Sequence, residues 1–131
     1  MKTIKSSGRS GKFTIKKSSF IATIYKIKSK MEAEELYKKT SEEFKKATHN
    51  AFAYRIGYPV EWEESSDDGE VKGCAGLPIM NILRNKEITN ILVIVTRFYG
   101  GIKLGPAGLI RSYSHCATDL IDKIGTCELG K

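Results

Sequence analysis

The spacing of hydrophobic residues changes several times along the chain. Three segments have the hydrophobic pattern typical of β-strands. Residues 13–28 are rich in β-branched and aromatic side chains. They predict a strand buried on both faces for part of its length, or two strands separated at Ser18 and Ser19. A further strand is expected over residues 50–58. Residues 90–98 include five consecutive branched aliphatic side chains and are expected to form the central strand.

Helical spacing predicts three helices between and after these strands. Ser29 followed by Glu32 is a capping box, and the apolar stripe after it predicts a helix that runs to about residue 48. A short helix is expected over residues 75–84. The last helix is expected over residues 107–124, with the glycine that follows it as the C-cap. Strands interspersed with helices predict an α/β (α+β) two-layer sandwich.

The basic residues are concentrated at the N-terminus. Residues 1–31 hold nine of the 22 lysines and arginines and none of the 15 acidic residues. Residues 1–12 are expected to be a flexible basic arm in front of a single domain over residues 13–131. Lysines on a strand edge also discourage aggregation, and charge alone does not separate this interpretation from RNA binding. The candidate RNA-contacting residues are Lys12, Lys16 and Lys17.

Composition argues against several classes of protein. Three cysteines without CxxC spacing and two distant histidines favour neither a disulfide framework nor a zinc site, so neither a metal nor another cofactor is expected. No apolar run approaches the roughly 20 residues that span a bilayer. No apolar stretch of signal-peptide length follows the basic N-terminus. A cytoplasmic protein without a membrane partner is therefore expected.

A glycine-rich turn stands between the central strand and the last helix. A helix N-terminus carries unpaired N–H groups and a partial positive charge, and glycines let an anion approach closely. An anion or RNA-phosphate site is therefore predicted, although the spacing matches neither the Walker nor the dinucleotide-binding pattern. The alternative is a tight turn whose glycines only adopt positive φ. The candidate residues are Arg97, Gly100, Gly101, Lys103, Gly105, Gly108 and Arg111.

Residues 61–73 hold six acidic side chains among serines and glycines, which predicts a loop. Asp67, Asp68 and Glu70 could hold a hard cation or act as an acid–base pair. The ligand spacing of an EF-hand is missing, however, and no activated nucleophile stands nearby. We therefore expect neither a metal site nor enzymatic activity.

Three ordered motifs resemble the IMPACT/YigZ family. ATHNAFAYR at residues 47–55 is similar to the family's AtHncyAyr, and SDDGEVKGCAGLPI at residues 66–79 to its sDDGEPsGTAGxPi. VTRFYGGIKLGPAGLIRSYS at residues 95–114 is similar to VtRyfGGikLGxGGLvraYs. The chain departs from these patterns at Val71 (family Pro), Cys74 (family Thr) and Pro106-Ala107 (family small residue and Gly). The loop residues that match the second motif are Asp67, Asp68, Gly69, Glu70, Gly73 and Gly76.

The resemblance implies a fold like the second domain of a small-subunit ribosomal protein, with helices packed on one face of a mixed β-sheet. It also implies a link to translation. Eukaryotic IMPACT proteins restrain the general-control kinase that phosphorylates an initiation factor, by competing for its activator protein. For the bacterial relatives, the resemblance implies association with nucleic acid or the ribosome, without an established catalytic activity.

Three functions remain open on the sequence. The preferred one is a non-enzymatic binding domain associated with translation, which contacts RNA, the ribosome or a translation-associated protein. The second is a small-molecule or nucleotide-dependent enzyme that uses residues 67–70 and 100–108. The third is a protein–protein adaptor that restrains a stress-response translation kinase.

Overall fold

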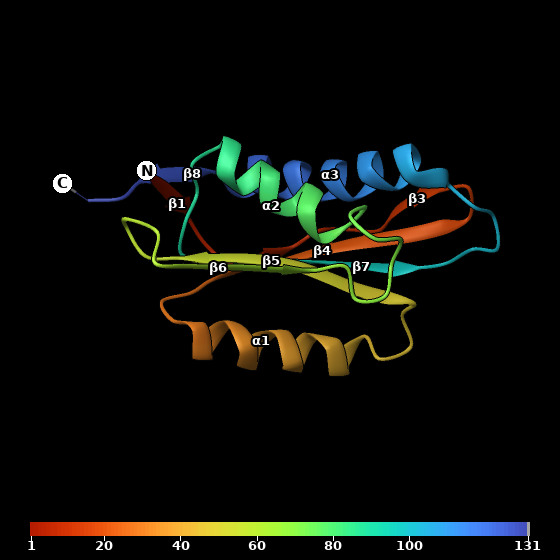
Figure 1. Cartoon of the computed structure of the whole chain (residues 1–131), viewed down its shortest axis with the longest axis horizontal. Helices are drawn as coiled ribbons and strands as arrows, with labels where there is room; N and C mark the ends of the chain where they lie inside the picture. The colour runs from red at the N-terminus through yellow and green to blue at the C-terminus, as the bar shows by residue number, and fades with distance from the viewer. Residues whose placement is uncertain (131) are drawn as a thin grey trace.

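An antiparallel sheet with helices on both of its faces makes up the molecule (Figure 1). The computed structural model describes residues 1–130. The elements are, in chain order, β1 (Lys2–Ile4), β2 (Gly8–Arg9), β3 (Phe13–Ile15), β4 (Ser18–Lys26), α1 (Lys30–Glu43), β5 (His49–Ile56), β6 (Trp62–Ser66), α2 (Gly76–Asn85), β7 (Ile91–Phe98), α3 (Gly105–Ile124) and β8 (Thr126–Glu128).

The six-stranded sheet has the order β2-β4-β7-β5-β6, and β3 also pairs with β4. Seven of the eight residues of β7 are buried, which confirms the prediction that this strand is central. Every strand pairing within the sheet is antiparallel, so the prediction of a mixed sheet is wrong. The physical reason is that β4 and β5 run parallel to each other, but β7 lies between them and prevents a parallel pair.

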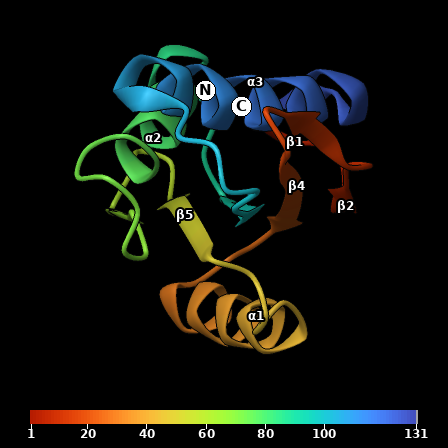
Figure 2. The ribbon, with the colours of Figure 1, turned by 90° about the vertical axis from the view of Figure 1, so that its right-hand side faces the viewer.

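Helices cover both faces of the sheet, with α2 and α3 on one face and α1 on the other (Figures 1 and 2). The prediction of a two-layer sandwich with helices on one face is therefore wrong, because the fold has three layers. Neighbouring side chains of a strand point to opposite faces. Accordingly, Val93 and Val95 of β7 join the core under α2 and α3, whereas Leu92 and Ile94 join a smaller core with α1.

The first twelve residues belong to the fold, which differs from the expected flexible arm. β1 pairs with β8, and β2 pairs with β4. Ile4 has no exposed surface and is part of the larger core. The segment is rich in lysine and serine, and Ile4 is its one large aliphatic residue. The strand pairing therefore leaves no hydrophobic pattern in the sequence.

Two further boundaries differ from the predicted ones. The break in residues 13–28 falls at Lys16 and Lys17, which form the β3–β4 turn, and not at the two serines after them. The acidic stretch predicted to be a loop contains the edge strand β6, in which Glu63 forms ion pairs with Arg55 and Arg84. These ion pairs neutralise the charge of Glu63, which lets this acidic residue stand in a strand.

The helix ends are close to those predicted. The Ser29 hydroxyl accepts a hydrogen bond from the N–H of Glu32, which confirms the N-cap of α1, although this helix ends at Glu43 and not near residue 48. Gly125 follows α3 with φ 88° and donates its N–H to the carbonyl oxygen of Ile121. This confirms it as the C-cap and fixes the direction in which the chain leaves the helix.

Candidate functional site

Asp67 holds the loop between β6 and α2 in shape. Its Oδ1 accepts hydrogen bonds from the backbone N–H groups of Ala75 (3.2 Å) and Gly76 (2.9 Å), and its Oδ2 accepts one from Gly73 (2.9 Å). Because the first N–H groups of a helix have no partner within it, Asp67 supplies the cap that the side chain of Ala75 lacks. A Cβ at Gly76 would lie 2.8 Å from backbone atoms of Ser66, so this close approach requires glycine.

Asp68 joins the same loop to the start of β5. Its Oδ2 accepts a hydrogen bond from the N–H of Asn50 at 2.7 Å, and its carbonyl oxygen accepts one from Nδ1 of His49 at 2.9 Å. Because a carbonyl oxygen only accepts, Nδ1 of His49 carries a hydrogen. Both aspartates therefore serve as acceptors that shape the loop.

Glu70 lies at the centre of a buried polar network. Its Oε2 accepts hydrogen bonds from Nη1 of Arg97 and from the Tyr113 hydroxyl, both at 2.7 Å. Arg97 also donates from Nη2 to Ser18 at 3.2 Å, while its Nε is buried without a partner among the described residues. Oε1 of Glu70 lies 3.5 Å from Nε2 of His49. The charge of Arg97 is thus neutralised by Glu70 inside the fold.

The surroundings keep Glu70 ionised and Tyr113 protonated. Burial alone would raise the pKa of the Glu70 carboxyl, but hydrogen bonds from Tyr113 and Arg97, with the positive charge of Arg97, lower that pKa below its ordinary value. Burial and the neighbouring carboxylate raise the pKa of Tyr113. The proton between these two groups therefore stays on the tyrosine, and Glu70 acts as an anionic acceptor.

A pocket of about 420 Å³ opens beside this network. It lies where the start of β5, the loop before α2, the end of β7 and the start of α3 meet. Polar side chains from the network form one part of its lining, and apolar side chains from the loop and α3 form another. The lining residues are Thr48, His49, Glu70, Val71, Arg97, Tyr99, Lys103, Leu104, Gly105, Pro106 and Leu109.

The tip of the β3–β4 hairpin packs against the glycine turn. Ile15 pairs with Ser18, so Lys16 and Lys17 form a two-residue turn, and both have positive φ, 45° and 68°. A Cβ at Gly100 would lie 2.0 Å from the carbonyl oxygen of Lys17, so no larger residue fits without displacing the hairpin. This contact brings the hairpin lysines to the turn that leads into α3.

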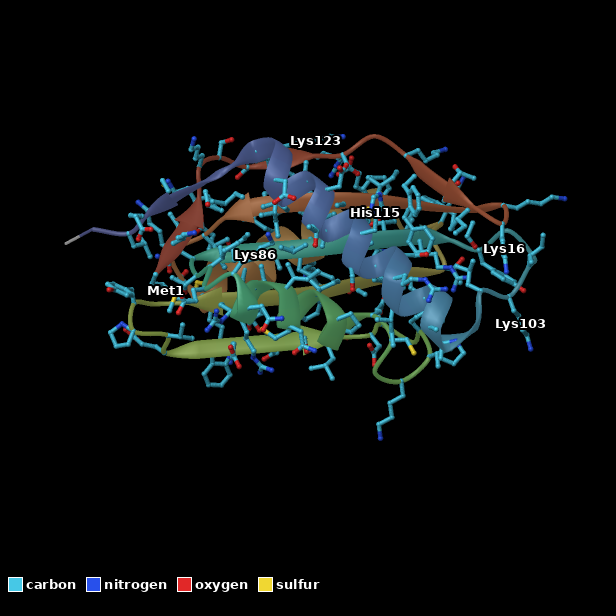
Figure 3. All side chains as sticks on the ribbon, turned by 90° about the horizontal axis from the view of Figure 1, so that it is seen from above. Met1, Lys16, Lys86, Lys103, His115 and Lys123 are labelled. Carbon is cyan, nitrogen blue, oxygen red and sulfur yellow. The ribbon has the colours of Figure 1, made fainter. Side chains whose placement is uncertain are left out.

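One end of the molecule therefore gathers lysines from two separate segments. Figure 3 shows Lys16 and Lys103 at the same end, away from Met1. On the turn beside Lys103, Tyr99 is 46% exposed and Ile102 is 43% exposed. We call this region the hairpin–turn surface, and it consists of Lys16, Lys17, Tyr99, Ile102 and Lys103.

The other residues predicted to bind an anion lie apart from this surface or shape the turn. Lys12 precedes β3, at the end of that strand opposite the hairpin tip, and Arg111 is exposed on α3 but does not line the pocket. Gly101 and Gly105 have positive φ, 91° and 76°, and the carbonyl oxygen of Gly108 accepts a hydrogen bond from Ser112. These glycines shape the turn, which is compatible with both the anion-site and the tight-turn interpretation.

Sequence reasoning assigned no role to His49 or Tyr113, although both contact Glu70. His49 stands in the first family motif and Tyr113 in the third, so membership of a motif is the one feature that marks them. Tyr113 lies 43 residues from Glu70 along the chain. No sequence-spacing rule relates residues that far apart, so the hydrogen bond between Glu70 and Tyr113 could be found only in the folded structure.

The described part of the chain offers few alternative chemical sites. Within residues 1–130, no three or more His, Cys, Asp and Glu side chains are grouped in a way that could hold a metal ion. Cys74 and Cys116 are buried, Cys127 is exposed, and all three are free thiols. None of the helices in this part combines the length and apolar character needed to cross a membrane.

Sequence comparisons find similarity over most of the chain. The profile of the Impact N-terminal domain matches residues 16–121. The IMPACT family member YvyE of Bacillus subtilis is 36% identical over 126 residues, which cover 96% of this chain and 58% of YvyE. YigZ of Escherichia coli is 35% identical, with 76% of this chain and 50% of YigZ covered. The protein IMPACT homolog of Caenorhabditis elegans is 33% identical, with 71% and 38% covered.

Solved structures share the fold. The crystal structure of a hypothetical protein matches with a TM-score of 0.89 at 27% identity, covering 96% of this chain and 62% of that one. The two-domain translational regulator Yih1 matches with a TM-score of 0.61 at 26% identity, covering 89% of this chain and 47% of that one. The chain thus spans only 38% to 62% of the length of these relatives.

Proposed function

The chain belongs to the IMPACT family, and we propose that it is a non-enzymatic binding domain of translation regulation that contacts RNA or the ribosome through the hairpin–turn surface. The link to translation is supported by the relative Yih1, a translational regulator. RNA as the partner is supported by the chemistry of the surface. Because the relatives are longer than this chain, the proposal concerns this domain and not their full activity.

The observation that carries the proposal is the convergence of Lys16, Lys17 and Lys103 beside an exposed tyrosine. The hairpin and the turn are more than eighty residues apart in sequence, yet Gly100 contacts the backbone of Lys17. Clustered ammonium groups attract phosphates by releasing the counterions bound to them. An exposed aromatic ring such as that of Tyr99 offers a surface on which an unpaired base stacks. Together these features suit a single-stranded segment of RNA.

The hydrogen bonds and the ionisation of the carboxylates in the loop before α2 support a binding role over catalysis. The carboxylates of Asp67 and Asp68 accept backbone N–H groups, and Glu70 accepts from Arg97 and Tyr113. A general acid needs a proton to give near the working pH, whereas the pKa of Glu70 is lowered despite its burial. We therefore propose that these groups build the site and do not transform a substrate.

Salt-dependent binding of a short single-stranded RNA of mixed sequence tests the proposal. Substituting Lys16, Lys17 and Lys103 by Gln should weaken binding at low salt, because three phosphate contacts are lost. The log–log slope of affinity against salt should flatten by about 0.7 for each contact. A matched control replaces three exposed lysines away from this surface by Gln, so that the net charge changes equally. The control lysines are Lys28, Lys38 and Lys39.

Three results would contradict the proposal. The first is a parent protein that does not bind RNA at low salt, and the second is equal weakening in the two triple variants. The third is turnover of a nucleotide or phosphoester that depends on Glu70 in a folded protein. Ribosome binding that survives the substitutions at the hairpin–turn surface would point to a protein partner in place of RNA.

A further inference from the structure

Tyr99 is held in place at the pocket beside Glu70 and has one open ring face. Its backbone N–H donates a hydrogen bond to the Thr48 hydroxyl at 2.9 Å. The guanidinium carbon of Arg97 lies over the ring at 5.3 Å from the centroid, a cation–π contact. Arg97 is itself held by its ion pair with Glu70. Because Arg97 covers one face of the ring, the opposite face is the one available to a ligand.

Most of the surface of this pocket is apolar. The apolar side chains come from the loop before α2 and from the start of α3, and they are those of Val71, Leu104, Pro106 and Leu109. The volume of about 420 Å³ is in the range of small-molecule sites. A simple ion gains little here, because Arg97 and Glu70 already neutralise each other. The pocket therefore suits a flat ring that stacks on Tyr99 and buries its remaining surface against apolar side chains.

The charges around the pocket indicate which kind of molecule brings such a ring. Lys103 lines the pocket, and Lys16 lies at the same end of the molecule (Figure 3). Lys17 follows Lys16 in the hairpin, and its carbonyl oxygen packs against Gly100 of the same turn. Ammonium groups beside an apolar pocket are complementary to a chain that carries negative charges and flat rings at regular intervals. A single-stranded nucleic acid has both features.

We propose that this pocket holds one unpaired purine base of the RNA strand that the hairpin–turn surface binds, an inference that rests on the proposed function. Proteins bind single-stranded RNA by splaying bases out and stacking them on aromatic side chains. A purine has a larger apolar face than a pyrimidine, and the gain from burial grows with the buried area. The base stacks on the open face of Tyr99, and Lys103 contacts a flanking phosphate.

Strands that differ by a single base test the proposal on the unaltered protein. The reference strand is a short chain of abasic ribose phosphates, which keeps every phosphate and has no base. The test strands carry one adenine or one uracil at the central position. We expect adenine to tighten binding about fivefold or more over the reference, the scale of one stacked base, and uracil to tighten it less. A gain from uracil equal to that from adenine would overturn the assignment of a purine.

Methyl resonances test the location of the base. The ring current of a base in the pocket should shift the methyl signals of Val71, Leu104 and Leu109 with the adenine strand and not with the abasic strand. Leu77 is exposed but lines a different groove, so its methyl signals should stay unmoved. An adenine strand that leaves the methyl signals of Val71 and Leu109 unmoved would place the base outside the pocket and overturn the assignment.

A matched pair of leucine substitutions tests the stacking partner. Tyr99→Leu removes the ring and should lose the gain from adenine, while the salt-dependent binding of the abasic strand persists. Trp62 is 45% exposed, close to the 46% of Tyr99, and pairs with Ile56 at the opposite end of β5 from His49. Trp62→Leu should therefore keep both properties. A gain from adenine that persists in Tyr99→Leu, or that is lost equally in both variants, would overturn the role of Tyr99.

Three further outcomes separate the possible failures. Equal binding of the adenine and abasic strands would refute the base site and leave the proposed function standing. No binding of single-stranded RNA of mixed sequence at low salt would refute the proposed function itself. A phenylalanine in an acidic peptide is the other occupant of matching chemistry. A peptide of alternating glutamate and phenylalanine that shifts the same methyl signals at lower concentration than the adenine strand would overturn RNA as the source of the ring.

Discussion

Replacing Glu70 with glutamine should destabilise the fold, because it leaves Arg97 as a buried charge without a counter-ion. The two side chains are 4% and 5% exposed, and their N–O distance is 2.7 Å. Removing one partner of a buried ion pair costs about 3–5 kcal/mol. Glutamine keeps the shape and one acceptor oxygen, so we expect the free energy of unfolding to fall by about 3 kcal/mol, the low end of that range.

The destabilisation should depend on pH in a defined direction. Burial alone would raise the pKa of Glu70, but its bonds to Tyr113 and Arg97 hold it below the ordinary value of 4.5. A carboxyl with a lowered pKa in the folded state binds protons less readily than in the unfolded state. Its stabilising effect is complete above about pH 4.5 and is lost as the pH falls through the folded-state pKa. The difference between the parent and Glu70→Gln should shrink over that acidic range.

Urea unfolding followed by circular dichroism, at neutral pH and at a series of acidic values, measures both effects. Glu43→Gln is the matched control, because Glu43 pairs with Arg9 on the exposed surface and its loss should change stability far less. The double substitution of Glu70 and Arg97 by Met should be more stable than Glu70→Gln, since no buried charge then lacks a partner. Equal stability of Glu70→Gln and Glu43→Gln would refute this account of the network.

Three other substitutions test the remaining contacts by the same unfolding measurement. Gly100→Ala should cost more than about 2 kcal/mol, because its Cβ would lie 2.0 Å from the Lys17 carbonyl oxygen. Gly11→Ala, where a Cβ meets no neighbour, is its control, and equal stability of the two would contradict the close packing. Ile4→Ala should cost about 2–5 kcal/mol, and unchanged stability would mean that β1 lies outside the core. Asp67→Ala should cost about 1–3 kcal/mol and speed amide exchange at the start of α2, and unchanged exchange there would contradict its capping role.

Elements with a long hydrophobic run or a local capping pattern could be predicted from the sequence, whereas the short strands β1 and β8 could not. The aliphatic run of β7 and the N-cap of α1 are local patterns, and the structure confirms both. β1 and β8 have three residues each, come from opposite ends of the chain and pair with each other. Their stability comes from that pairing and from the burial of Ile4, and neither leaves a periodic pattern in the sequence.

The three-layer arrangement was partly visible in the sequence. A strand with aliphatic residues at every position has no polar face, so it needs cover on both sides. That requirement follows from the run in β7, and it conflicts with the expectation, taken from the resemblance, that helices lie on one face. The apolar stripe of α1 supplies the second cover through Ala33, Leu36 and Tyr37.

The roles of the acidic residues could not be predicted, because their partners are backbone groups that every residue type offers. Three acids in a Ser- and Gly-rich segment are compatible with a cation site, an acid–base pair or a capped loop. The three backbone N–H groups bound by Asp67 come together only when the loop turns back on itself. Likewise, Arg97 was predicted to bind an external anion, and the structure instead pairs it with Glu70.

The buried network is built from residues that match the family patterns, and two of the departures from those patterns line the pocket beside it. Glu70, Arg97 and Tyr113 come from matching positions and depend on one another for charge and hydrogen bonds. Val71 and Pro106 are departures, and both line the pocket. Changing a network residue leaves a buried group unpaired, at a cost to folding, whereas changing Val71 or Pro106 alters the shape that the pocket presents. The network therefore fixes the frame of the site, and Val71 and Pro106 are positions at which the pocket of this chain differs in shape from the family pattern.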